Sequence, residues 1–295
     1  MTQFPIDNPM PRRALGATGE QLSILGFGGI LVMGATQTDA NNLVSEAIDC
    51  GINYFDVAPS YGDAEERLGP ALAPFRHKAF LACKTERRDA TGARAHLEQS
   101  LKTLQTDHID LYQLHALTDL EKDVDAVLKP GGALEALVRA RDEGLVRYLG
   151  FSAHSPHAAL RAMEEFPFDT ILYPVNIATH VHGSFETAPL QEARKHGMGI
   201  LALKALARGA WDSSSVVARK ADYPKCWYEP FTRRDEALQG LRFSLGQPAV
   251  TAALPPGHED LWRMALELLE EAVTMGAPGE EELQSVATQL NPIFS

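Results

Sequence analysis

The chain has 295 residues and a mass of 32.2 kDa, enough for one large domain or two small ones with a sizeable core. It is 45% apolar and 22% charged, which is ordinary for a globular protein and excludes intrinsic disorder. The formal net charge of −12 makes broad binding to nucleic acids or anionic membranes unfavourable without a local basic patch.

The first five residues have neither the basic nor the apolar part of an export signal, and no apolar run is long enough to cross a bilayer. Three cysteines, Cys50, Cys83 and Cys226, are far apart and odd in number. That pattern favours reduced thiols over a disulfide framework or a zinc knuckle. We therefore expect a cytoplasmic protein.

Two short segments, 13–15 and 21–23, flank Gly16-Ala17-Thr18-Gly19 and are typical of a small β-hairpin. After them, β-rich runs alternate with segments of helical periodicity. The runs are 24–30, 53–58, 79–84, 108–115, 146–152, 170–177, 199–206 and 249–254. Eight alternations predict an α/β fold, a (β/α)₈ TIM barrel whose bottom the hairpin closes. No linker divides the chain, so residues 1–295 are predicted to form a single domain.

Two predicted connections are longer than a simple turn, at 118–132 and 210–232. Both follow strands and would lie on the catalytic face of a barrel, where long loops form substrate walls. The second contains Trp227 and Tyr228, which would be costly as solvent-facing decoration. A surface insertion without function is the alternative interpretation.

Ionisable residues lie near the ends of three consecutive runs. Asp56 lies near the end of the second run, and Tyr61 follows five residues later. Lys84 ends the third run and His115 ends the fourth. Neighbouring barrel strands are about 4.8 Å apart, so these side chains can converge. Each alone has a structural explanation, as a helix cap, a packed ring, a solvated charge or a core histidine. Together they favour catalysis.

The chemistry of this set is that of an acid and a base. An ammonium stabilises a nearby phenolate, so we expect Lys84 to make the Tyr61 proton easier to give up near neutral pH. Asp56 would hold Lys84 in its charged form, and a neutral His115 would donate a hydrogen bond to a carbonyl oxygen. The set predicts protonation of an oxygen that gains charge.

The octet Phe55-Asp56-Val57-Ala58-Pro59-Ser60-Tyr61-Gly62 resembles the signature of the aldo/keto reductase superfamily. The likeness runs from about residue 15 to 266 and includes 146–152 and 250–257. It implies a (β/α)₈ fold and hydride transfer from a nicotinamide cofactor. In this resemblance Tyr61 is the general acid, Lys84 and Asp56 tune it, and His115 orients the carbonyl.

The resemblance also implies cofactor contacts. In the family a Ser-Asn pair after strand five and a Gln on strand six hold the carboxamide. Ser152 matches, Ala153 and His154 stand in place of the Asn, and Asn176 stands where the Gln is expected. His154 is the candidate to supply the missing contact.

The segment 203–209 resembles the loop of the family that covers the pyrophosphate, and it offers Lys204, Leu206 and Arg208. Lys204 and Arg208 would pair with the phosphate charge, or they are ordinary surface residues. After strand eight come Gly257 and His258, then two acids, and then Arg263 on a helix. Relatives place basic residues there to hold the 2′-phosphate, so we expect NADPH, with NADH possible.

Two other patterns suggest different chemistry. Gly26-Phe27-Gly28-Gly29 is reminiscent of a dinucleotide fingerprint, but Leu31 stands where the third glycine is needed. His180 and His182 have the spacing of some barrel metal sites, but together with His154 they are better interpreted as lining a polar cavity than as zinc ligands. Cys83 is expected to face the helices, because side chains alternate along a strand.

The leading hypothesis is an NAD(P)H-dependent carbonyl reductase, or the reverse alcohol dehydrogenase, that acts on a small molecule and holds no metal. A nicotinamide-binding barrel that acts as a sensor or interaction subunit is the second hypothesis. A divalent-metal hydrolase is the third. Neither the substrate nor the oligomeric state can be inferred from the sequence.

Overall fold

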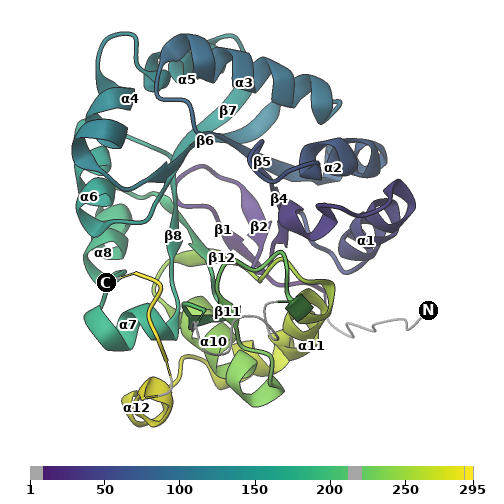
Figure 1. Ribbon diagram of the computed structural model, residues 1–295, viewed down its shortest axis with the longest axis vertical. Coiled ribbons are helices and arrows are strands. Elements are labelled where there is room, and N and C mark those ends of the chain that lie inside the picture. Colours follow the sequence, from purple (N-terminus) through teal and green to yellow (C-terminus); the bar gives the residue numbers. More distant parts are fainter. Residues whose placement is uncertain (1–8, 212–220, 289, 295) are drawn as a thin grey trace.

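The two edges of one parallel sheet meet and close it into a barrel (Figure 1). The computed structural model describes residues 9–211, 221–288 and 290–294. Within these residues, eight parallel strands pair in the order β3-β4-β5-β6-β7-β8-β9-β12. Leu25 forms a parallel bridge with Ala253, and the Gly26 N–H donates to the Ala253 carbonyl at 3.0 Å. The predicted (β/α)₈ barrel is confirmed.

The barrel strands follow the predicted runs along the chain. They are β3 (Phe27–Gly28), β4 (Tyr54–Asp56), β5 (Phe80–Thr85), β6 (Ile109–Leu117), β7 (Val146–Ala153), β8 (Thr170–Pro174), β9 (Gly199–Leu203) and β12 (Val250–Leu254). Four strands, β3, β4, β8 and β9, are shorter than predicted by three residues or more. A 3₁₀ helix, η1 (Gly29–Val32), follows β3, Asn176 caps a helix after β8, and Lys204 leaves β9 with a left-handed backbone, φ 61°.

Helices surround the barrel and cover its outer face (Figure 1). They are α1 (Gln37–Asp49), α2 (Ala64–Leu72), α3 (Ala90–Thr103), α4 (Ala126–Leu128), α5 (Ala133–Asp142), α6 (Pro156–Glu165), α7 (Ile177–Gly183), α8 (Thr187–Lys195), α10 (Arg234–Gly246), α11 (Glu259–Met275) and α12 (Glu280–Ala287). Their apolar faces and the outward strand residues form the larger core cluster. In the parts of the chain that are described, no helix is long and apolar enough to span a membrane.

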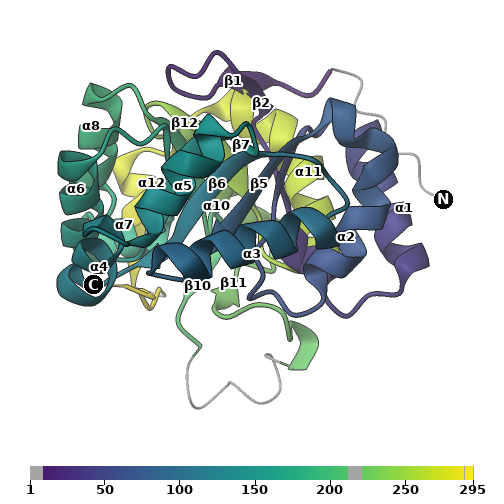
Figure 2. The same cartoon turned by 90° about the horizontal axis from the view of Figure 1, so that it is seen from above.

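The predicted hairpin consists of β1 (Arg12–Ala14) and β2 (Gln21–Ser23), which pair antiparallel. Figure 2 shows it across one end of the barrel, opposite the end that carries β10 (Ala207–Gly209) and β11 (Glu229–Pro230). Leu15 and Leu22 are fully buried in the cluster inside the barrel. Gly16, at φ 53°, allows this approach, because a Cβ there would lie 2.3 Å from the backbone nitrogen of Gly199. The hairpin therefore closes the barrel end where β9 begins.

Removing the buried side chain of Leu15, by which the hairpin closes the barrel, should destabilise the protein. We expect Leu15→Ala to lower the free energy of unfolding by about 2 to 5 kcal/mol, because it leaves a cavity in the barrel interior. Leu120→Ala is the matched control, since that leucine is 46% exposed, and it should change stability by no more than about 0.5 kcal/mol. Urea unfolding followed by circular dichroism measures both values. Equal effects of the two substitutions would contradict the conclusion that Leu15 fills the end of the barrel.

Candidate active site

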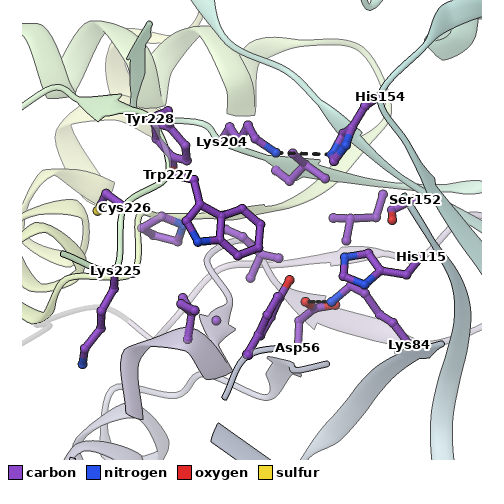
Figure 3. Close-up of a pocket in the computed structure, with 18 residues that line it drawn as sticks. Asp56, Lys84, His115, Ser152, His154, Lys204, Lys225, Cys226, Trp227 and Tyr228 are labelled. Atoms are coloured by element: carbon purple, nitrogen blue, oxygen red, sulfur yellow. Dashed lines mark hydrogen bonds and ion pairs between the residues drawn. The ribbon is translucent and has the colours of Figure 1, made fainter. Parts of the chain in front are cut away.

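A cavity opens at the carboxyl ends of the barrel strands, and all four residues predicted to be catalytic line it (Figure 3). Asp56 is the last residue of β4, and Lys84 and His115 lie just before the ends of β5 and β6. Tyr61 comes from the loop between β4 and α2. The barrel thus brings these side chains together as expected for the catalytic face of this fold.

Asp56 and Lys84 form a buried ion pair. Burial by itself lowers the pKa of Lys84, but the Asp56 carboxylate and nearby Tyr61 outweigh it and raise this pKa to about 12. The other Asp56 oxygen accepts hydrogen bonds from the Tyr54 hydroxyl at 3.3 Å and from Gln113 Nε2 at 3.1 Å. Lys84 is therefore a fixed cation, and its carboxylate partner is held from three sides.

Sequence reasoning missed Tyr54 and Gln113. Tyr54 lies two residues before Asp56 on the same face of β4, which alternation along a strand could have indicated. Gln113 pairs with Lys84 in the register between β5 and β6. That register has no visible signature in the sequence.

Tyr61 stands against Lys84, with the ammonium 5.2 Å from the centre of the phenol ring. The edge of the ring meets His115 and Trp227, with centroid separations of 6.1 and 5.9 Å. Burial raises the pKa of Tyr61, and the opposing effect of Lys84 does not cancel it. Lys84 lowers this pKa, as predicted, but desolvation of the phenolate outweighs the ammonium, so the net pKa of Tyr61 is raised and is not brought toward neutral pH. The hydroxyl keeps its proton at neutral pH and is available as an acid.

His115 is held by an irregularity in β6. Ala116 has φ 57°, and its N–H donates to Ser152 Oγ at 2.8 Å. Arg88 Nη2 donates to the His115 carbonyl at 2.9 Å. Burial, followed by the charge of Lys84, lowers the pKa of His115 to about 2. The imidazole is therefore neutral and carries one N–H, as expected from the sequence.

A second polar pair faces the cavity from the residues that directly follow β7 and β9. Lys204 Nζ lies 3.3 Å from His154 Nε2. The ring of Phe294 stacks on the ring of His154, with 4.8 Å between the ring centroids. The Lys204 ammonium lies 5.2 Å from the centre of the Phe294 ring. Burial and the charge of Lys84 lower the pKa of Lys204 to about 7. Burial and Lys204 lower that of His154 to about 3, so this imidazole is neutral.

The segment 210–232 contributes a wall of the cavity in its described part, through Lys225, Cys226, Trp227 and Tyr228. Trp227 is 60% exposed, and Lys225 Nζ donates to the Leu31 carbonyl at 2.7 Å. Residues 212–220 of the predicted segment lie outside the described residues. The companion prediction for 118–132 is wrong, because that segment folds into η3 (Leu120–Asp125) and α4 and contributes no residue to the cavity lining.

The predicted cofactor residues divide into two groups. Ser152, His154, Lys204 and Gly257 line the cavity. The others are Asn176, Leu206, Arg208, His258 and Arg263, which lie away from this lining. Leu206 is buried in the core, and His258 precedes α11 with its ring against Tyr223, 4.9 Å between centroids.

The remaining three already have partners in the fold. Asn176 Oδ1 accepts from the Thr179 N–H at 3.1 Å, while its buried Nδ2 has no partner among the residues that the structure describes. Arg208 pairs with Glu229 at 3.0 Å. Arg263 contacts Glu46 through two nitrogens, both at 2.9 Å.

Of the histidines predicted to line a polar cavity, only His154 does so. His180 Nδ1 lies 2.6 Å from Glu186 Oε1, and His182 Nε2 lies 3.1 Å from the Leu290 carbonyl. Both are on α7, and neither is among the residues that line the cavity. The prediction is wrong for His180 and His182.

Cys83 faces the helices, as expected from strand alternation. Its Sγ lies 3.3 Å from Glu65 Oε1 on α2 and 3.7 Å from Ser100 Oγ on α3. Burial raises the pKa of this thiol well above its ordinary value. The residue is part of the structure beneath the site and does not face the cavity.

The cavity is electropositive although the chain is acidic overall. Among the described residues that line it, Lys84, Lys204 and Lys225 are basic and Asp56 is the one acid. Asp56 is committed to Lys84, so two ammonium groups are left without a carboxylate partner there. Such a lining favours an anion.

Comparisons with known proteins agree with this arrangement. The sequence model of the Aldo/keto reductase family matches residues 25–288. Two uncharacterized oxidoreductases of Bacillus subtilis (strain 168) are similar in sequence. YqkF is 28% identical over 275 residues, 83% of this chain and 86% of that protein. YrpG is 31% identical over 283 residues, 81% of this chain and 85% of that protein.

The solved aldo-keto reductase AKR11C1 from Bacillus halodurans, in its holo form, has a similar fold. The match has a TM-score of 0.71 with 22% identity and covers 97% of this chain and 98% of that one. The similarity supports the barrel architecture.

Proposed function

Since the chain belongs to the aldo/keto reductase family, we propose that it reduces an aldehyde or ketone to an alcohol, or catalyses the reverse, with NAD(P)H and with Tyr61 as general acid. Membership of this family makes it a carbonyl/alcohol oxidoreductase. The observation that carries the finer proposal is the convergence of Tyr61, Lys84 and His115 on one cavity, with Asp56 behind the lysine.

The proposed mechanism follows from the protonation states. The neutral His115 donates its N–H to the carbonyl oxygen and orients the carbonyl. Tyr61, protonated at neutral pH, donates its proton to the same oxygen as negative charge develops there. Lys84, fixed by Asp56, stabilises the phenolate that Tyr61 becomes. In the reverse direction the same phenolate accepts the proton of the alcohol.

The residues of the cavity fit a nicotinamide dinucleotide. Ser152 Oγ accepts from the Ala116 N–H and keeps its own O–H for the carboxamide, beside the neutral His154. Lys225, at the cavity wall, has no carboxylate partner among the described residues, so its ammonium can pair with a phosphate of the cofactor. Gly257 keeps the wall open beside Ile30. When bound, the cofactor supplies the hydride.

The preference for NADPH over NADH is expected to be modest. Arg263, the cation predicted to hold the 2′-phosphate, is paired with Glu46 and must loosen that contact to bind a ligand. The gain from the additional 2′-phosphate of NADPH is thus partly offset by the ion pair that must be given up.

Titration of the purified protein with each reduced cofactor, followed by quenching of tryptophan fluorescence, should give the smaller Kd for NADPH. Arg263→Gln should reduce the difference, whereas Arg194→Gln on α8 should not. Equal or tighter binding of NADH by the unchanged protein would overturn the preference.

Consumption of the bound cofactor with a panel of aldehydes and ketones tests the activity itself. We expect reduction of at least some members of the panel. A protein that binds the cofactor and reduces none of them would favour the sensor hypothesis instead.

A further inference from the structure

We propose that Lys204 and His154 form a binding site for a carboxylate group of the substrate, so that this protein prefers carbonyl compounds that carry a carboxylate. This inference rests on the proposed function, because it assigns the substrate class to the same cavity. It departs from the expectation that Lys204 meets a phosphate of the cofactor.

The first argument is the unbalanced charge of Lys204. Its ammonium lies inside the cavity lining, and its partners among the described residues are the neutral ring of His154 at 3.3 Å and the face of Phe294 at 5.2 Å. Neither partner is an anion, and burial lowers the pKa of Lys204 to about 7, so the amine is only partly protonated near neutral pH and an anion beside it would favour the protonated form. A desolvated cation without a counter-ion is costly, so an anion that enters the cavity gains by pairing with it.

The contacts orient the ammonium without satisfying it. His154 accepts one hydrogen bond through Nε2, which leaves further donors on Lys204 Nζ. Phe294 stacks on His154 at an interplanar angle of 15°, and Phe185 in turn stacks on Phe294 at 19°. The aromatic stack keeps the imidazole in place, so the lysine is aimed by its surroundings and remains free to donate.

The backbone commits the side chain to this position. Lys204 follows β9 directly and has φ 61°, a left-handed conformation that is uncommon for residues other than glycine. A conformation of this kind persists only where the surrounding structure enforces it, and it is concentrated at functional sites. The turn therefore supports a role for the side chain inside the barrel mouth.

The position of Lys204 favours a substrate group over a cofactor phosphate. Lys204 lines the same cavity as Lys84 and His115, so it shares the cavity with the reacting groups. Figure 3 shows the Lys204–His154 contact and the Asp56–Lys84 pair both facing the cavity, with Trp227 to one side of them in this view. Lys225, in contrast, is bound to Leu31 at the wall. A carbonyl at Tyr61 thus leaves the rest of a small substrate within the lining that contains Lys204.

The test compares 4-carboxybenzaldehyde with its methyl ester, which differ in charge and hardly in shape. We expect kcat/KM for the carboxylate to exceed that for the ester by about 10- to 100-fold, the range of a charge-assisted hydrogen bond. Lys204→Met should bring the ratio to about one, and Lys204→Arg should restore part of it. Lys195→Met, an exposed lysine on α8, removes the same net charge and should keep the ratio.

A ratio near one in the unchanged protein, or a ratio that survives Lys204→Met, overturns the inference. It is also overturned if Lys204→Met weakens cofactor binding and leaves the ratio unchanged, because the anion is then a phosphate of the cofactor. Calorimetric titration of the protein with the two aldehydes separates this result from failure of the proposed function. A carboxylate preference in binding that Lys204→Met abolishes supports the site even without turnover, whereas no preference in binding rejects it.

Discussion

Replacing Tyr61 with phenylalanine should lower kcat by about 100- to 10,000-fold, the contribution of a positioned general acid, while the affinity for the nicotinamide cofactor stays near that of the unchanged protein. The substitution removes one oxygen and leaves the ring between His115 and Trp227. The loss arises because His115 is neutral and is needed to orient the carbonyl, and Lys84 is held in its charged form by Asp56. Neither replaces the phenol as the proton donor at neutral pH.

Single-turnover measurements with saturating cofactor separate the chemical step from binding and release. Tyr112→Phe is the matched control, since it removes a buried hydroxyl from β6 outside the cavity lining, and it should keep the turnover of the unchanged protein. If Tyr61→Phe also keeps its turnover, another group is the acid and the proposed mechanism is wrong.

The sequence predicts the catalytic set because that set depends on local features. Asp56, Lys84 and His115 come near the ends of strands whose apolar runs are recognisable, and parallel strands place their ends at one rim. The hairpin that closes the barrel is predicted equally well, because Gly16 and Gly19 mark its turn. These inferences need only the order of the elements and the direction of the chain.

What the sequence misses depends on contacts between distant segments. Gln113 reaches Asp56 over 57 positions because of the register between β5 and β6. The contact of Phe294 with His154 depends on how residues 290–294 lie against α7 and β10. The direction of the pKa of Tyr61 depends on a balance between burial and an opposing charge, and only coordinates give the burial.

Lys84→Met should abolish detectable turnover and also destabilise the fold. Removing the ammonium leaves the Asp56 carboxylate buried with two neutral donors, Tyr54 and Gln113, and no counter-charge. Breaking a buried pair on one side costs about 3 to 5 kcal/mol, so a large fall in the unfolding midpoint is expected. Thermal unfolding and urea unfolding measure this cost. A variant as stable as the unchanged protein would mean that the carboxylate takes up a proton or gains water in the folded state.

The double variant Asp56→Asn, Lys84→Met separates the two roles of the pair. An asparagine at position 56 presents a neutral oxygen to Tyr54 and Gln113, so no buried charge is left without a partner. Removing both members of a buried ion pair is often close to neutral for stability, and we expect most of the loss seen in the single variant to be recovered. Turnover should stay at the level of Lys84→Met, because the phenolate that Tyr61 becomes has lost its cation. If the double variant regains activity along with stability, then Lys84 acts only through the fold, and the ammonium has no part in the chemistry.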